Sequence, residues 1–155
     1  MPLFTIASFN VKNLIGADKE FYEFQTYTPE EYAWKKAWLA DQLLTMDADI
    51  VGFQEIFEED ALRDVVREAD GRGDALNEAS IPDKSKEYHK KAVFRKLSYE
   101  GYSDAALAFA PNSADEGVEG KRRPGLAILS RFGFEGEPKV IQDLEKPLVI
   151  PFPRL

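Results

Sequence analysis

The chain contains 155 residues, and 20 Lys and Arg against 28 Asp and Glu give a formal net charge of −8 at pH 7. That length suits one modest domain. Its 44% apolar and 12% aromatic residues can supply a core, which argues against disorder throughout. The longest uncharged stretch, residues 1–11, is far shorter than the roughly 18–20 apolar residues of a membrane span, so we expect no such span.

The residue types present restrict the chemistry that the chain can perform. It has no Cys and a single His, which excludes disulfide scaffolds, thiolate zinc clusters, cysteine nucleophiles and most multi-histidine metal sites. The acidic balance argues against an architectural nucleic-acid binder, because counterion release requires a surplus of Lys and Arg. A nuclease that brings a divalent cation to the phosphate is not excluded. The N-terminus lacks the basic region of a secretory signal, and we expect a cytoplasmic location.

The first half predicts a strand, a long helix and a second strand. Residues 3–11 carry apolar side chains at both parities, which indicates a strand covered on both faces. Residues 28–31 (TPEE) form a capping box with Pro at the first helical position, so we expect a helix over residues 29–46. The uncharged run at residues 50–54 predicts a buried strand. This order is typical of a right-handed parallel crossover.

Two tryptophans lie opposite the apolar stripe of the predicted helix. Trp34 and Trp38 are four residues apart, so we expect their rings to stack on each other. Two exposed indoles need a cover. We expect the aromatic loop at residues 12–27 to provide it, with another piece of protein as the alternative.

The second half predicts a further helix and several strands. The helix is expected over residues 58–69, with Gly71 and Gly73 ending it. Residues 74–103 are highly charged and show a weak pattern. Two strands, at residues 105–110 and 125–130, are expected to pair like a hairpin, and two more are expected at residues 140–144 and 148–152.

Two polar residues are placed by this pattern at one edge of the sheet. Asn10 falls at the end of the first strand and Glu55 directly after the second. The carboxyl ends of parallel strands are where open α/β sheets bind ligands. A carboxylate there can hold Mg²⁺, and an amide can donate to a phosphoryl oxygen. Spacing alone leaves open the alternative that both are loop caps or solvated residues.

Three motifs occur in a recognisable order. Residues 5–14 (TIASFNVKNL) resemble the opening strand of the endonuclease/exonuclease/phosphatase superfamily, and residues 49–56 (DIVGFQEI) resemble its second motif, which ends in Gln-Glu. Residues 123–131 (RPGLAILSR) are similar to its G-x-A-I-L-S-R strand. The resemblance implies an α/β fold, the DNase I-like four-layer α-β-β-α sandwich, with mixed sheets and flanking helices.

The resemblance also implies an activity and a cofactor. Family members hydrolyse phosphodiester or phosphomonoester bonds with Mg²⁺, for which Mn²⁺ is an alternative. Glu55 would be the metal ligand, and Asn10 would help to position the phosphate or the attacking water. The later Asp-x-Asn and Ser-Asp-His motifs are absent, so we expect residues 1–155 to be a partial domain without its C-terminal half, catalytically incomplete by itself.

Two further features could contact a phosphate. Lys121, Arg122 and Arg123 form a basic cluster that could bind substrate oxygens, although a solvated loop is the competing interpretation. His89 lies in a charged stretch and precedes the motif at residues 123–131, where the family's His follows it. We therefore expect His89 to be a surface residue.

The alternative to an enzyme is a non-catalytic half-domain that acts as an interaction or structural module. The expected partners are a phosphoester substrate, with nucleic acid among the candidates, and the missing C-terminal half. Without that half we expect self-association through the apolar sheet face formed by the strands at residues 4–10, 50–54 and 125–129.

Overall fold

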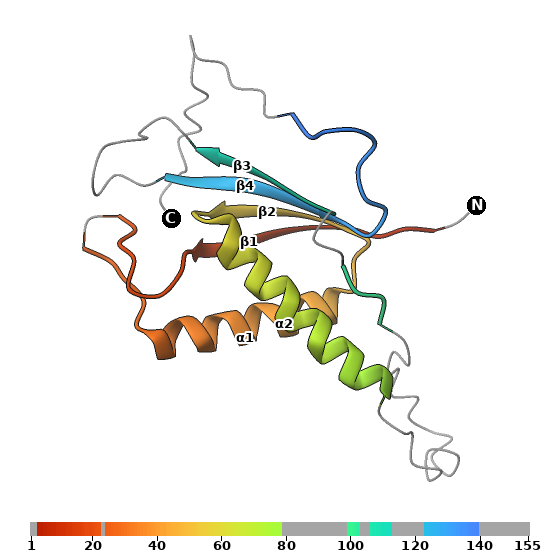
Figure 1. Ribbon diagram of the computed structural model, residues 1–155, viewed down its shortest axis with the longest axis horizontal. Coiled ribbons are helices and arrows are strands. Elements are labelled where there is room, and N and C mark those ends of the chain that lie inside the picture. The colour runs from red at the N-terminus through yellow and green to blue at the C-terminus, as the bar shows by residue number, and fades with distance from the viewer. Residues whose placement is uncertain (1–2, 23, 79–98, 103–105, 113–122, 140–155) are drawn as a thin grey trace.

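The computed structural model describes residues 3–22, 24–78, 99–102, 106–112 and 123–139. Within them the chain is an α/β structure with a mixed four-stranded sheet and two helices (Figure 1). The sheet order is β1-β2-β4-β3, in which β1 and β2 are parallel and the other pairs antiparallel. The elements are β1 (Ile6–Leu14), α1 (Pro29–Met46), β2 (Ile50–Ile56), α2 (Glu59–Glu78), β3 (Leu107–Asn112) and β4 (Arg123–Ser130).

Helix α1 begins and ends where the sequence predicts. The Thr28 side chain accepts a hydrogen bond from the Glu31 backbone, and the Glu31 carboxylate accepts one from the Thr28 N–H. Pro29 fixes the first helical φ. At the other end, Asp47 adopts a left-handed conformation and its N–H donates to the Leu43 carbonyl. The parallel pairing of β1 with β2 completes the expected crossover.

Helix α2 is longer than predicted and runs through both glycines to Glu78. A Cβ on Gly73 would lie 1.9 Å from the Tyr99 ring, so this glycine is a packing site for Tyr99 rather than a helix end. Asn77 fixes the same segment, because its side chain both donates to and accepts from the Tyr99 backbone. One Gly inside a helix costs about 1 kcal/mol of helix propensity, and the packing of Tyr99 on α2 offsets that cost.

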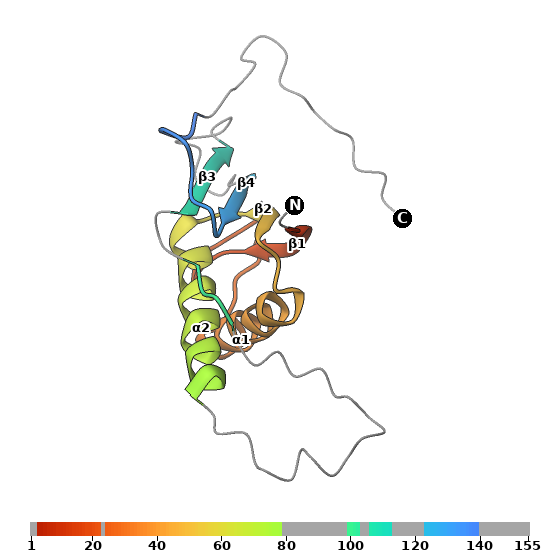
Figure 2. The ribbon, with the colours of Figure 1, turned by 90° about the vertical axis from the view of Figure 1, so that its right-hand side faces the viewer.

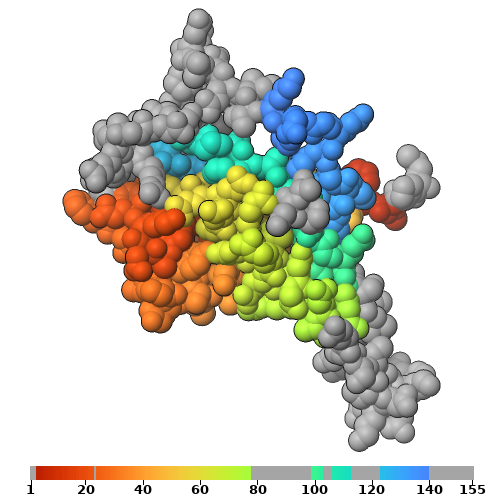
Figure 3. All heavy atoms as spheres, viewed as in Figure 1, coloured from red at the N-terminus to blue at the C-terminus, as the bar shows by residue number. Residues whose placement is uncertain are grey.

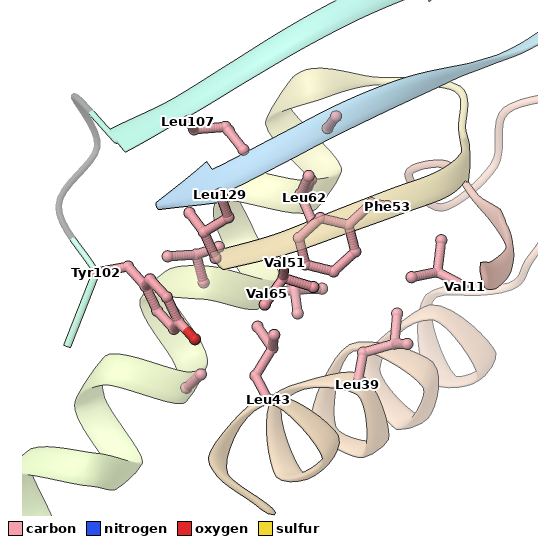
Figure 4. Close-up of a cluster of buried hydrophobic side chains, with 14 of the residues drawn as sticks. Val11, Leu39, Leu43, Val51, Phe53, Leu62, Val65, Tyr102, Leu107 and Leu129 are labelled. Atoms are coloured by element: carbon pink, nitrogen blue, oxygen red, sulfur yellow. The ribbon is translucent and has the colours of Figure 1, made fainter. Parts of the chain in front are cut away.

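The core lies between the helices and one face of the sheet. Figures 1 and 2 show α1 and α2 on the same side of the strands. Figure 4 shows the side chains that fill the layer between them: Val11, Leu39, Leu43, Val51, Phe53, Leu62, Val65, Tyr102, Leu107 and Leu129. In the described part of the chain, neither helix has the length and apolar composition needed to cross a membrane.

The opposite face of the sheet is open, so the prediction that the first strand is covered on both faces is wrong. Ile6 is 68% exposed, Leu126 58% and Ile128 49%, and in β4 the last two alternate with buried Ala127 and Leu129. The register places Asn10, Gln54 and Leu126 in one row across the strands, and Ser8, Gly52 and Ile128 in the next. We call the surface formed by Ile6, Ser8, Asn10, Gln54, Leu126 and Ile128 the open sheet face.

The predictions that Trp34 and Trp38 stack on each other and that the aromatic loop covers them are also wrong. Trp34 is 70% exposed, and the ring that contacts Trp38 is Phe9, with centroids 6.3 Å apart. The loop aromatics pack on each other and beside the start of α2 instead: Phe21 stacks on Tyr27 at 4.9 Å and lies 5.8 Å from Phe57. Figure 3 shows this loop segment next to the first residues of α2.

The predicted hairpin-like pair is confirmed, since β3 and β4 are antiparallel neighbours with Ala108 opposite Ile128. Both strands differ by two residues from the expected bounds, with β3 ending at Asn112 and β4 beginning at Arg123. The strands expected at residues 140–144 and 148–152 lie outside the described residues.

Candidate functional site

Asn10 and Glu55 meet at the carboxyl edge of the parallel pair, as the sequence predicts. The Asn10 Nδ2 atom donates a hydrogen bond of 2.8 Å to Glu55 Oε1. Asn10 is exposed and Glu55 is partly buried, so solvent reaches the pair. Both residues lie inside their strands rather than at the ends, because β1 continues to Leu14 and β2 to Ile56.

A backbone irregularity directs Glu55 toward Asn10. Phe53 and Ile56 are both buried in the core, whereas Gln54 faces the other way and donates to Ser8 Oγ at 3.2 Å. Strict alternation would turn Glu55 back to the core. Instead, Glu55 has a left-handed φ of 65°, and the register shifts between Gln54 and Ile56 on both sides of β2. This is a β-bulge, a device that re-aims a side chain.

A second irregularity follows Asn10 in β1. Lys12 and Asn13 have φ of 55° and 63°, so two consecutive residues other than glycine are left-handed. The Lys12 N–H donates to Asn10 Oδ1 at 2.8 Å. The amide oxygen of Asn10 is therefore held by the backbone, and its NH₂ group faces the Glu55 carboxylate.

A lysine on α1 and a tyrosine in the loop before α1 donate hydrogen bonds to the carbonyls of this turn. Lys35 Nζ donates to the Lys12 carbonyl and, at 2.7 Å, to the Tyr27 hydroxyl, which in turn donates to the Asn13 carbonyl at 3.1 Å. Burial and, to a smaller extent, the nearby Lys12 charge lower the pKa of Lys35 to about 8, while the Glu55 charge opposes the change. Burial raises the pKa of Tyr27, and the charges of Glu31 and Glu55 add to that effect.

The site offers one carboxylate to a cation. Among the residues in the described ranges, no group of three or more His, Asp and Glu side chains could hold a metal ion. The Asn10 hydrogen bond engages Glu55 Oε1. Mg²⁺ binds through as few as one or two carboxylates and keeps several waters. One accessible carboxylate beside an amide is therefore compatible with a hydrated Mg²⁺ or Mn²⁺.

Arg123 lies at the same end of the sheet. It is exposed and is the first residue of β4, which runs antiparallel to β2 with Gly125 opposite Ile56. Its position two residues beyond that pair places it at the end of the sheet that carries Glu55. Arg122 and Lys121, the rest of the predicted basic cluster, and His89 lie outside the described residues.

Sequence reasoning missed Lys35 and Tyr27. A signal for Lys35 was present, because it lies three residues after Tyr32 and four before Leu39, on the buried side of the helix. A lysine at such a position needs a polar partner for its amine. No sequence signal points to the bulge, because Glu is not a residue type that favours left-handed backbone.

The chain was also compared with known proteins. No protein-family model, curated protein or solved structure matches it.

Proposed function

We propose that the chain is the N-terminal part of a metal-dependent phosphoesterase of the endonuclease/exonuclease/phosphatase superfamily, with a DNase I-like sandwich as its complete fold. The contact between Asn10 and Glu55 is the observation that carries this proposal. Two motifs 45 residues apart contribute one side chain each, and the parallel crossover brings the two into hydrogen-bond contact. Loop caps or solvated residues would not need the bulge that turns Glu55 to Asn10.

Each residue has a proposed role. Glu55 would hold Mg²⁺, or Mn²⁺ in its place, and the bound metal would stabilise negative charge and lower the pKa of a bound water. Asn10 presents amide N–H groups beside the carboxylate and would donate to a phosphoryl oxygen without adding negative charge. Arg123, together with Arg122, would attract the phosphate from the end of β4.

The proposed substrate is a phosphoester, with nucleic acid as one candidate class. The net charge of −8 opposes the approach of any polyanion, so the metal and the arginines would have to provide the local attraction. A small phosphoester, or a nuclease that depends on its metal rather than on a broad basic groove, fits this charge best.

Mg²⁺ binding by the full chain, measured by calorimetry, tests the proposal. We expect weak binding, because one carboxylate leaves most of the coordination shell to water. Glu55→Gln should abolish the heat of binding, whereas the control Glu20→Gln, which removes an exposed carboxylate from the loop before α1, should not change it. Equal binding by wild type and Glu55→Gln would contradict the proposal.

A second candidate function is that of a non-catalytic interaction module. The open sheet face favours it, because it exposes the apolar side chains of Ile6, Leu126 and Ile128, and grouped exposed apolar side chains are typical of interaction surfaces. The proposed partner is the C-terminal half of the family fold, or a second copy of the chain. This function requires the open sheet face but not Glu55, so the calorimetric experiment separates it from the enzyme proposal.

A further inference from the structure

A continuous series of hydrogen bonds joins helix α1 to Glu55. Lys35 Nζ donates to the Lys12 carbonyl, the Lys12 N–H donates to Asn10 Oδ1, and Asn10 Nδ2 donates to Glu55 Oε1. The series passes through the backbone of one residue, Lys12. Its carbonyl accepts a hydrogen bond from Lys35 on α1, and its N–H donates to the side-chain amide of Asn10. Movement of Lys12 would therefore change the direction in which Asn10 points.

The turn at Lys12 needs external support. Lys12 and Asn13 are both left-handed. A lysine lacks the short polar side chain with which Asn or Asp can form a local hydrogen bond that stabilises this conformation. Such residues persist where the surrounding structure holds them. Lys35 binds the Lys12 carbonyl directly, and Tyr27, to which Lys35 also donates, binds the Asn13 carbonyl.

Burial of the Lys35 amine costs hydration free energy, which indicates that its contacts with the turn are important. Its Nζ lies 4.7 Å from the centroid of the Tyr27 ring, and burial together with the neighbouring Lys12 charge lowers its pKa to about 8. The next residue, Lys36, shows the ordinary alternative, an ion pair at 3.5 Å with Glu68 on α2. Lys35 is half-buried, so it gives up part of its hydration and binds two polar groups at the turn that follows Asn10.

We propose that Lys35 is a positioning residue that fixes the Lys12–Asn13 turn and, through it, holds the Asn10 amide against Glu55. Its importance for catalysis rests on the proposed function, whereas its effect on the Asn10–Glu55 contact does not. Lys35 acts on the backbone of Lys12, so it belongs to the support of the site rather than to the groups that would touch a substrate.

The side-chain amide signals of Asn10 in the ¹H–¹⁵N spectrum of the full chain test the proposal. Glu55→Gln and Asn10→Ala assign these signals and define how they move when the carboxylate is lost. We expect Lys35→Met to shift both the Asn10 side-chain amide and the Lys12 backbone amide. Lys36→Met, the same change one residue away on α1, should leave both signals in place. Unmoved Asn10 signals in Lys35→Met would overturn the proposal.

Chemical rescue distinguishes the effect of the Lys35 amine from the effect of side-chain packing at that position. The chain contains no cysteine, so Lys35→Cys can be alkylated at that one position to give an aminoethyl cysteine, an isostere of lysine. We expect the unmodified variant to behave like Lys35→Met and the alkylated one to regain the wild-type Asn10 signals. Failure to regain them in a folded protein would count against the role of the amine.

A second variant covers the case in which Lys35→Met does not fold. Tyr27→Phe removes the hydroxyl that links Lys35 to the Asn13 carbonyl and leaves the stacked ring in place. We expect it to shift the Asn10 amide in the same direction as Lys35→Met, by a smaller amount. Wild-type signals in Tyr27→Phe would overturn the proposed support of the turn.

Mg²⁺ affinity connects this inference to the proposed function. If wild type binds Mg²⁺, Lys35→Met should bind it about tenfold more weakly, the lower end of the range for residues that orient metal ligands. Unchanged affinity would overturn the importance of Lys35 for the metal site. If wild type does not bind Mg²⁺, the proposed function fails, while the shifts of the Asn10 amide still decide whether Lys35 positions it.

Discussion

Glu55 combines a strained backbone with a partly buried functional group that solvent can reach. Its left-handed φ of 65° costs an L-residue about 1–2 kcal/mol. That cost is the result of turning the carboxylate out of the core and toward Asn10. Strain of this kind concentrates at functional sites, where the gain in geometry offsets the loss in stability.

Removal of the side chain should reveal this strain. At an ordinary strand position, Gly is about 0.5–1 kcal/mol less stable than Ala. At position 55 we expect the reverse, with Glu55→Gly more stable than Glu55→Ala by about 0.5–1 kcal/mol, because Gly adopts positive φ without a penalty. Urea denaturation of the two variants measures the difference. An Ala variant as stable as the Gly variant would mean that position 55 is unstrained.

We expect the titration of Lys35 to change the pH dependence of the free energy of unfolding. The groups that face it are Lys12 on β1, Glu55 on β2 and Tyr27 in the loop. Its pKa falls from 10.5 in the unfolded chain to about 8 in the folded one. Between these values the unfolded state holds more protons, so the free energy of unfolding contributed by Lys35 rises with pH, and this contribution is lost as pH falls through about 8.

The measurement compares wild type with Lys35→Met in urea, with a chelator present. The stability of wild type relative to the variant should increase from pH 8 to pH 10.5, because only wild type carries the Lys35 titration. A difference that stays constant over this range would show that the Lys35 amine titrates normally.

At the scale of the elements, α2 contains two glycines with opposite roles. Gly71 is exposed and a Cβ there would meet nothing within 4 Å, whereas a Cβ on Gly73 would collide with the Tyr99 ring. Their spacing in sequence gives no hint of this difference. Only the segment that packs on the helix from residues 99–102 distinguishes them.

Alanine at the two positions should therefore act in opposite directions. We expect Gly71→Ala to stabilise the fold by about 1 kcal/mol through helix propensity. Gly73→Ala should destabilise it by about 1–3 kcal/mol, because Tyr99 must move away. Thermal unfolding of the two variants gives the comparison. Stabilisation by both would mean that Tyr99 does not pack on α2.

Some features of the helices and strands were predictable from the sequence, and others were not. The limits of α1 follow from local signals, the capping box at Thr28 and the turn at Asp47, and these were predictable. The length of α2 depends on a distant tyrosine and was not. The meeting of Asn10 and Glu55 was predictable from the parallel crossover, but the bulge and the Lys35 support depend on contacts between elements.

At the scale of the molecule, the sheet has helices on one side and an open face on the other. The register aligns apolar residues of β4 with polar residues of β1 and β2, so the open sheet face is apolar toward Leu126 and Ile128 and polar toward Ser8 and Asn10. Its members are uncharged, so the net charge of −8 does not oppose contact at this face directly.

We expect the chain to self-associate through this face when no partner is present. Light scattering over a wide concentration range should show a mass that rises with concentration, and Ile128→Lys should reduce that rise by placing a charge in the contact. Leu76→Lys provides the control, because Leu76 is an exposed apolar residue on α2. A wild-type monomer at all concentrations would remove the support for the interaction module.

We propose that Glu55 holds a divalent metal beside Asn10 at the carboxyl edge of β1 and β2. Paramagnetic broadening by substoichiometric Mn²⁺ in the ¹H–¹⁵N spectrum of the full chain tests it most directly. We expect the signals of Asn10, Glu55 and their strand neighbours to broaden first, and Glu55→Gln to remove this broadening. Broadening that begins at acidic residues elsewhere, such as those at the start of α2, and that Glu55→Gln leaves unchanged would contradict it.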